Sequence, residues 1–447
     1  MRDILVIALV ALFALMALRR PWIGVMLWTW ISIMNPHRYA WGFAASAPVA
    51  MVAALVTLIG MLFSRERESP FKGAPVWLFF AFSLWITLSW LLGVDPVGDY
   101  AQWDKVMKIY LMTFVALILL NNRHHIMAFV WVTAGSLALL GLKGGIFTVL
   151  HAGNYRVWGP GGSFIQDNNA FALALIVTVP LVYFLYLQVQ QKWARYGLLF
   201  TMSMCVVSAL GSHSRGALLA LIAMGAVFWW RSRHKGLISA LIALMVLLIL
   251  PMMPAEWWAR MGTIAEYQQD HSAIGRLNGW IVAWEVAKHH FFGAGMSYQH
   301  QHFFDLYGYY NNHVIAAHSI YFQVLGNHGF GGLVLYLAMW LATYRTASWL
   351  RVHAQALPQA QWAADLGAMV QVGLVGFAVG GAFLSLSYFD LPYNMMVMVV
   401  LARRWVQTRG WERDPPGSLL EYAGLMRRKR PHAGVAPATG MARRLPS

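Results

Sequence analysis

The chain has 447 residues, of which 59% are hydrophobic and only 11% are charged. A soluble domain of average composition has roughly 25% charged residues, so these values exclude an ordinary soluble enzyme and indicate an integral membrane protein with many spans. The formal net charge of +16 does not indicate nucleic-acid binding, because the basic residues form short clusters after alternate apolar runs, as the positive-inside rule describes. The single cysteine excludes disulfides and thiol metal sites.

Apolar runs of roughly 20 residues, the length needed to cross a bilayer, follow one another along the chain. They cover residues 4–18, 22–34, 41–63, 74–93, 100–120, 126–150, 169–189, 196–211, 215–230, 236–253, 319–350, 363–388 and 391–405. The first two runs are short and Pro21 lies between them, so they form either a hairpin of two helices or one kinked helix. We therefore predict an all-α integral membrane protein with 12 or 13 transmembrane helices.

The charge of the loops predicts the orientation of these spans. Loops rich in Lys and Arg fall on one side, which is predicted to be cytoplasmic, and the tail from Arg403 onward adds ten Lys or Arg against three acids. Four parts follow from this arrangement: an N-terminal transmembrane bundle, a large outer loop with short helices, C-terminal transmembrane helices and a basic cytoplasmic tail. Their predicted bounds are 1–253, 254–318, 319–405 and 406–447.

The outer loop 254–318 is the one long polar interruption in the chain. Seven of the chain's 16 histidines lie in it, among many aromatic residues. A membrane protein keeps so much polar chain between two spans only where water reaches it or where it lines a site, so we interpret this loop as catalytic. The histidine pairs invite a metal hypothesis, but no HExxH or comparable carboxylate-bearing pattern accompanies them, and no metal ligand is predicted.

Several cations remain on the outer side, where the positive-inside rule disfavours them. Arg215, in "GSHSRGALLAL", lies where one helix ends and another begins. It can grip a phosphate by bidentate hydrogen bonds, or it can extend to the membrane surface as a structural residue. Arg276 precedes an amphipathic stretch with Trp280, predicted to lie along the membrane surface. It is either a second anion-binding group or a partner of loop acids such as Glu266 and Asp270.

His318 opens a long apolar helix. Its imidazole is suited to accept a hydroxyl proton near neutral pH, although a lone interfacial histidine also occurs as a structural residue. The remaining candidates for substrate contact are polar residues at outer helix ends, some of which also suit helix capping or a turn. These candidates are Lys143, Arg156, Asn168, Asn169, Trp280, His313 and Asp390. Asp390 could orient His318, pair with an arginine or serve the turn before Pro392.

Three of these segments occur in a recognisable order: "SRGALLAL", then "GRLNGWIVAWEVAKHHFFGAGMSYQ", then "HSIYFQVLGNHGFGGL". Together they resemble the three successive motifs of the O-antigen ligase and polymerase superfamily. The match covers about Ser212 to Leu333, and the span count is similar across the chain. His328 stands in a part of the third motif that is usually acidic. The N-terminal half, with "NPHRYAWG", looks more like the branch described as O-glycosylation ligases.

The resemblance implies a glycosyltransferase of the GT-C type in the bacterial inner membrane, with its active site facing the periplasm. It would transfer a glycan from undecaprenyl diphosphate to a lipid A–core sugar, with inversion and without a metal or other cofactor. Arg215 and Arg276 would hold the diphosphate, and His318 would be the general base. A polymerase or a ligase acting on a protein hydroxyl would share these motifs. A transporter or flippase is the alternative from another class, and it would place its polar groups near the bilayer midplane.

Overall fold

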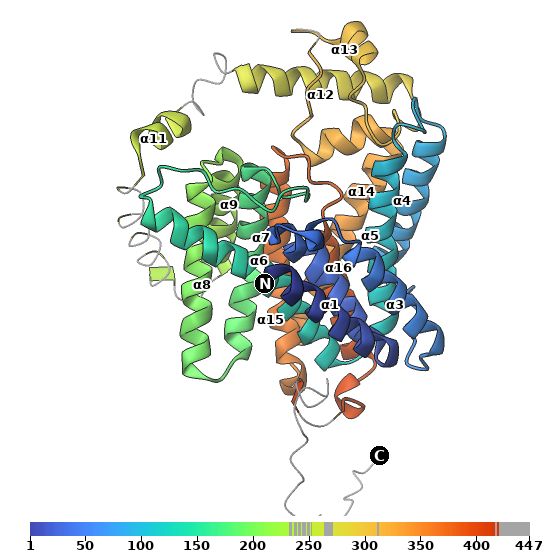
Figure 1. Cartoon of the computed structure of the whole chain (residues 1–447), viewed down its shortest axis with the longest axis vertical. Coiled ribbons are helices and arrows are strands. Elements are labelled where there is room, and N and C mark those ends of the chain that lie inside the picture. Colours follow the sequence, from blue (N-terminus) through green and yellow to red (C-terminus); the bar gives the residue numbers. More distant parts are fainter. Residues whose placement is uncertain are drawn as a thin grey trace, which may run out of the picture.

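The computed structural model describes residues 1–231, 235–236, 239, 243, 247, 251, 253–262, 271–310, 313–415 and 418–419, and the account below is confined to them. Within these ranges the regular elements are all helices (Figure 1). The N-terminal half contains α1 (Arg2–Arg19), α2 (Pro21–Met34), α3 (Val49–Phe63), α4 (Ala74–Leu91), α5 (Tyr100–Leu119), α6 (Arg123–Leu150), α7 (Asn168–Gln188), α8 (Lys192–Gly211) and α9 (Arg215–Arg231). The C-terminal half contains α11 (Ala255–Gly262), α12 (His271–His289), α13 (Gln301–Tyr307), α14 (Ile320–His353), α15 (Gln361–Gly381) and α16 (Asp390–Gln407).

The helices agree closely with the apolar runs of the sequence. Every predicted run coincides with a described helix except 236–253, most of which lies outside the described residues. The run predicted from Trp41 becomes helical only at Val49, because a short 3-10 turn and Pro48 come first. Six segments are long and apolar enough to cross a membrane: α4, α6, α7, α8, α14 and the stretch Pro358–Gly381, while α2, α3 and α9 are shorter apolar helices. The all-helical membrane class is confirmed, and the total of 12 or 13 spans stays a prediction.

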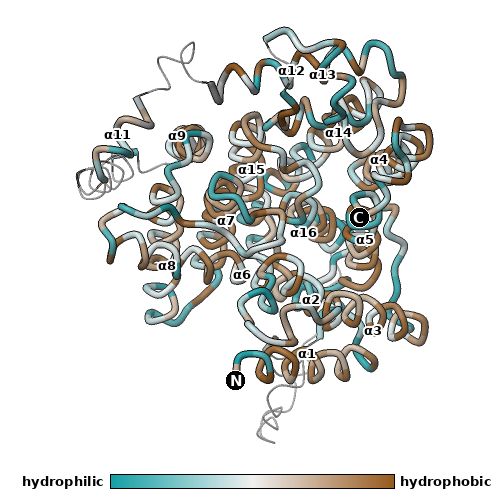
Figure 2. Tube along the Cα trace, turned by 45° about the horizontal axis from the view of Figure 1, so that its top comes forward, coloured by the Kyte–Doolittle hydropathy of each residue, from teal (hydrophilic) through white to brown (hydrophobic). Residues whose placement is uncertain are grey.

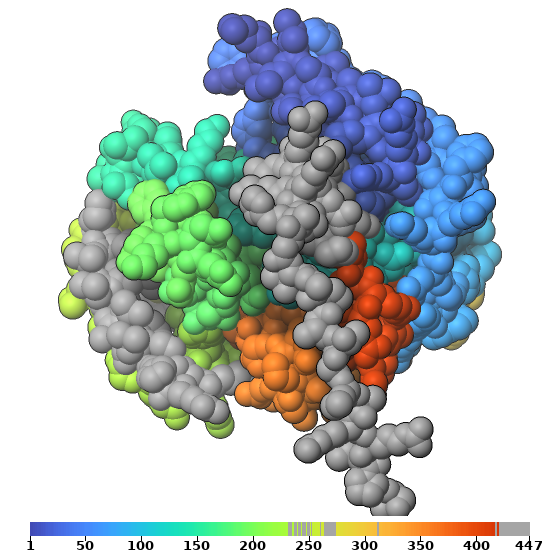
Figure 3. All heavy atoms as spheres, turned by 90° about the horizontal axis from the view of Figure 1, so that it is seen from below, coloured from blue at the N-terminus to red at the C-terminus, as the bar shows by residue number. Residues whose placement is uncertain are grey.

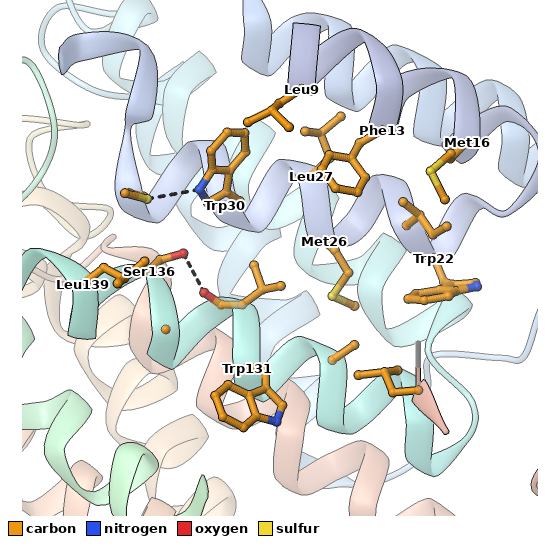
Figure 4. Close-up of a pocket in the computed structure, with 16 residues that line it drawn as sticks. Leu9, Phe13, Met16, Trp22, Met26, Leu27, Trp30, Trp131, Ser136 and Leu139 are labelled. Atoms are coloured by element: carbon orange, nitrogen blue, oxygen red, sulfur yellow. Dashed lines mark hydrogen bonds between the residues drawn. The ribbon is translucent and has the colours of Figure 1, made fainter. Parts of the chain in front are cut away.

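The first two runs form a hairpin of two helices. Arg20 has φ −135° and ψ 82° between them, and Pro21 occupies the first turn of α2, where its missing N–H costs no helical hydrogen bond. Figure 4 shows the two helices antiparallel, with Leu9 near Trp30 at one end and Met16 near Trp22 at the other. The break at Arg20 therefore decides between the two alternatives that the sequence left open.

Most helices run roughly along the long axis of the molecule, and α12 crosses the upper end of this bundle (Figure 1). Hydrophilic segments lie mainly in the connections at the helix ends (Figure 2). Seen from below, the N-terminal helices occupy one side, and the ends of α15 and α16 lie near the centre (Figure 3). At that lower end the buried guanidinium of Arg404 donates to the carbonyls of Leu117 (3.1 Å) and Leu120 (2.7 Å). It also lies 3.4 Å from a carboxylate oxygen of Glu68.

α14 is interrupted within its first third. Gly329 has φ 66° and ψ −174°, a conformation that favours glycine, and it breaks the helix at this point. The turn after α12 packs into the break, because the N–H of Ala294 donates to the Gly326 carbonyl and that of Gly295 to the Asn327 carbonyl, both at 3.0 Å. The buried imidazole of His328 bonds the Tyr388 hydroxyl at 2.7 Å. The glycines of the second and third motifs thus join the outer segment to the bundle.

The only cysteine, Cys205, is fully buried in α8. Its sulfur lies 3.9 Å from the Ala138 carbonyl oxygen of α6. Gly141 on α6 faces the same sulfur so closely that no Cβ would fit between them. The thiol is therefore part of the contact between α6 and α8.

Candidate functional site

The site begins at the N-terminus of α7 and the turn between α8 and α9. Asp167 caps α7 by accepting from the backbone N–H groups of Asn169 (2.8 Å) and Ala170 (3.0 Å). The amide of buried Asn168 donates to the Ser212 carbonyl at 2.7 Å. His213 has a left-handed φ of 60°, and Ser212, His213 and Ser214 are all buried. These contacts fix the turn that ends immediately before Arg215.

Arg215 is the first residue of α9, and the hydroxyl of Ser214 accepts the Ala217 N–H at 3.2 Å as its cap. Arg276 comes from α12, which crosses the same end of the bundle. Both arginines line one small cavity. The full lining is Asn169, Ser214, Arg215, Gly216, Arg276, Phe383 and Leu384. Two predicted anion-binding residues, more than 60 positions apart in the chain, therefore meet at a helix N-terminus, where free N–H groups also favour negative charge.

The cavity is narrow. Its volume is about 10 Å³. In this structure it has room for little more than one water molecule. The arrangement is that of two arginines lining one cavity at the upper end of the bundle (Figure 1).

The pKa of His318 responds to the charge of Arg276, which lines this cavity. It has φ 44° and directly precedes Ser319 and α14. Burial lowers the pKa of the half-buried His318 imidazole, the charge of Arg276 lowers it further, and the charge of Asp167 raises it. The imidazole is consequently neutral near pH 7, which is the form that accepts a proton. Arg215 and Arg276 thus share a cavity, and the pKa of His318 responds to the charges of Arg276 and Asp167.

Helix α12 is held in place by Trp280. Its indole N–H donates to the Ala317 carbonyl at 2.7 Å, and its ring stacks on Phe322 with centroids 4.9 Å apart and planes 6° apart. The structure therefore gives Trp280 a packing role that connects Arg276 to the segment bearing His318. Arg276 lies within α12 rather than before it, because the helix starts at His271. The predicted partners Glu266 and Asp270 lie outside the described residues.

Other predicted substrate contacts lie elsewhere. Arg156 and His313 are exposed and do not line the cavity. Lys143 is exposed on α6, with its ammonium 4.8 Å from the centre of the Tyr39 ring. Asp390 is buried among Thr29, Ser32 and Asn394 inside the bundle, so the proposed interaction with His318 is not present. Asn168 supports the turn before Arg215, whereas Asn169 lines the cavity.

Sequence reasoning missed two features of the site. Asp167, not Asp390, is the acid whose charge acts on His318, and it was not among the candidate site residues. Phe383 and Leu384 also line the cavity, and nothing in an apolar run distinguishes such lining residues. Within the described ranges, no three His, Cys, Asp or Glu side chains are grouped so that they could hold a metal ion.

The fold and this cavity define an all-helical membrane protein with two arginines lining a cavity at one end of its bundle (Figure 1). Comparison with known families agrees with that description. Residues 200–337 match the family model described as O-antigen ligase, and residues 1–190 match a family of unknown function, DUF5935. No curated protein matches the chain. The first match contains Arg215, Arg276 and His318, and it confirms the resemblance of this segment to the O-antigen ligase superfamily, whose members are glycosyltransferase-like enzymes.

Proposed function

We propose that this protein is an O-antigen ligase of the bacterial inner membrane. It transfers a glycan from undecaprenyl diphosphate to a sugar hydroxyl of lipid A–core, at an active site facing the periplasm, while its C-terminus is cytoplasmic. The observation that carries the proposal is the shared cavity of Arg215 and Arg276, with His318 close enough to Arg276 for its pKa to respond. The family match at residues 200–337 supports the reaction class.

In this mechanism the acceptor hydroxyl attacks the anomeric carbon of the lipid-linked sugar from the side opposite the diphosphate. The bond between that carbon and the diphosphate oxygen breaks, and its electron pair leaves with the diphosphate. The acceptor proton passes to the neutral imidazole of His318. Attack from the opposite side inverts the anomeric configuration, and the GT-C class follows from this donor and the membrane setting.

The two arginines stabilise the leaving group. Charge accumulates on the diphosphate as the bond breaks, and fixed guanidinium groups in a site with little water interact with it strongly. Their positive charge supplies the neutralisation that a divalent ion gives in other transferases, so we predict activity without added metal. General-base catalysis by His318 contributes about 10²–10⁴-fold.

The convergence of these groups also favours a transferase over a transporter. A transporter would place its polar groups near the middle of the membrane, whereas Arg215 and Asn169 occupy the first turns of α9 and α7 and His318 directly precedes α14. A polymerase or a ligase acting on a protein hydroxyl would use the same donor and the same three residues. The identity of the acceptor distinguishes these two activities from the proposed ligase.

The test is transfer by the purified protein with undecaprenyl-diphosphate glycan, lipid A–core and EDTA. Product from the wild type and a loss of about 10²-fold or more in His318→Ala are expected. His302→Ala is the matched control, because His302 is exposed on the same outer segment and packs on Phe303 instead. A ladder of longer lipid-linked glycan would identify a polymerase. Activity that disappears with EDTA and returns with a divalent ion would overturn the metal-free mechanism.

A further inference from the structure

A second cavity, which shares no lining residue with the arginine site, lies between the α1–α2 hairpin and α6. It has a volume of about 420 Å³, within the size range of small-ligand sites. Figure 4 shows Leu9, Phe13 and Met16 on one wall, Trp22, Met26 and Trp30 on the second, and Trp131 with Leu139 on the third. We call this cavity the hairpin groove.

The lining of the hairpin groove is almost entirely apolar. Among its 16 residues only Ser136 carries a hydroxyl, and that hydroxyl already donates to the Val132 carbonyl of its own helix at 2.6 Å. The indole N–H of Trp30 points to the sulfur of Met34 at 3.1 Å. Because the lining offers so few polar groups to position a sugar or a phosphate, the groove suits only a hydrocarbon chain.

The groove opens to the exterior of the bundle, beside the N-terminal helices. Leu139, on its rim, is 55% exposed, and Trp131 is 36% exposed. The outward face of α1 also carries exposed Leu5, Leu12 and Leu15. In water such a continuous apolar surface would be unfavourable, so a bilayer covers it and lipid chains have direct access to the groove.

One end of the groove is cationic. Arg19 and Arg20 form the turn between α1 and α2, next to the lining residues Met16 and Trp22. The ring of Trp22 lies 4.7 Å from that of His125 near the start of α6. Within the described ranges Arg19 is exposed and forms no ion pair. Cationic side chains at the end of a hydrocarbon-binding groove complement the phosphate of an anionic lipid headgroup.

We propose that the hairpin groove holds one acyl chain of an anionic phospholipid whose headgroup phosphate lies beside Arg19 and Arg20. The bound lipid fills the space between the α1–α2 hairpin and α6, and so ties the hairpin to the rest of the bundle. This inference assigns a binding site to the part of the chain that matches a family of unknown function. It does not depend on the transferase proposal.

The decisive variant is Gly135→Leu. A Cβ at Gly135, which lines the groove, would meet no atom within 4 Å, so a leucine side chain extends into the groove without a clash. Gly225→Leu is the matched control, because Gly225 on α9 has equally open surroundings but lies outside the groove. Leucine has a higher helix propensity than glycine, so both variants are expected to fold.

The experiment is native mass spectrometry of the full-length protein from micelles containing phosphatidylglycerol or phosphatidylcholine. The wild type and Gly225→Leu are expected to retain one phosphatidylglycerol per chain. Gly135→Leu is expected to retain at least tenfold less phosphatidylglycerol. The double variant Arg19→Gln, Arg20→Gln should still bind a lipid but lose its preference for phosphatidylglycerol, by about fivefold for each arginine.

Three results would overturn the proposal. They are equal retention by Gly135→Leu and the wild type, equal binding of both lipids by the wild type, and recovery of a polyprenyl phosphate in place of a phospholipid. Because the readout is binding and not glycan transfer, failure of the transferase assay would leave this result interpretable.

Discussion

Arginine side chains are held at both ends of the helical bundle, but their surroundings differ. At the upper end Arg215 and Arg276 line a cavity together with Asn169. At the lower end Arg404 donates to two carbonyls that end α5 and lies against Glu68, and it lines none of the cavities described above. A buried or half-buried charge alone therefore does not indicate a site. The difference is the space beside the guanidinium group and the presence of a second cation facing the same space.

Of the effects that test this comparison, the largest is expected for the cavity arginines. Arg276→Gln and Arg215→Gln should each reduce transfer by about 10²–10³-fold, because each removes a donor aimed at the charge that develops on the leaving group. Rates from the purified variants, measured with saturating donor, test this. Lys288→Gln is the matched control, because Lys288 lies on α12 as well but is paired with Glu285 at 2.8 Å. Equal losses of transfer rate in Lys288→Gln and Arg276→Gln would show that an arginine in the cavity matters no more than a cation elsewhere on α12.

The lower arginine should affect stability and not chemistry. Arg404→Met leaves two carbonyls without their donor and removes one of the two cations beside Glu68, which keeps Lys72 at 3.1 Å. Such a loss at a buried ion pair costs about 3 kcal/mol. Thermal unfolding in micelles should shift to lower temperature, with the transfer rate per folded molecule unchanged. Arg409→Met should shift it little, because Arg409 is 72% exposed and lies 3.8 Å from Glu412. A transfer defect in folded Arg404→Met would contradict the structural role.

The pH dependence should change in opposite directions for the two charges near His318. A general base must be neutral, so transfer falls as the pH drops through the pKa of His318, which burial and Arg276 hold below its usual value. Arg276→Gln should raise this pKa and move the acid limb of the rate profile to higher pH. Asp167→Asn should lower the pKa and move the limb to lower pH.

Two features make the Asp167→Asn experiment specific for the charge of Asp167. Asparagine caps a helix as well as aspartate does, so α7 is expected to stay intact in the variant. Asp390→Asn serves as the comparison, because Asp390 is buried in a separate part of the bundle. Its profile should keep the acid limb of the wild type. A shift of equal size in both aspartate variants would show that the effect is not specific to the site.

The sequence predicted the helices well because hydropathy and length are properties of contiguous residues. It predicted Arg215, Arg276 and His318 because their motifs are also contiguous, and the structure brings the two arginines to one cavity with His318 electrostatically coupled to Arg276. The roles of Asp167 and Asp390 were not predictable in this way. Both acids stand at the start of a helix, and only the packing of α7 beside the turn before α9 places Asp167 near His318.

Packing also gives Trp280 and Lys143 contacts that their residue types alone do not predict. Trp280 lies in a stretch with the spacing and composition of a membrane-surface helix. In the structure its ring stacks on Phe322 and its indole N–H donates to the Ala317 carbonyl. Lys143 stands near the outer end of its helix, yet it faces the ring of Tyr39. The hairpin groove was not anticipated either, because residues that line an apolar groove do not differ in type from those that face the membrane.

Cys205 gives the molecule a practical property for chemical labelling. Its sulfur is shielded from solvent by the contact between α6 and α8, and maleimides react with accessible thiolates. The natural chain therefore has little background reactivity, and no cysteine needs to be removed before others are introduced. A cysteine placed at Lys288 and another at Arg409 would report, through a reagent that cannot cross the membrane, which end of the bundle faces the cell exterior.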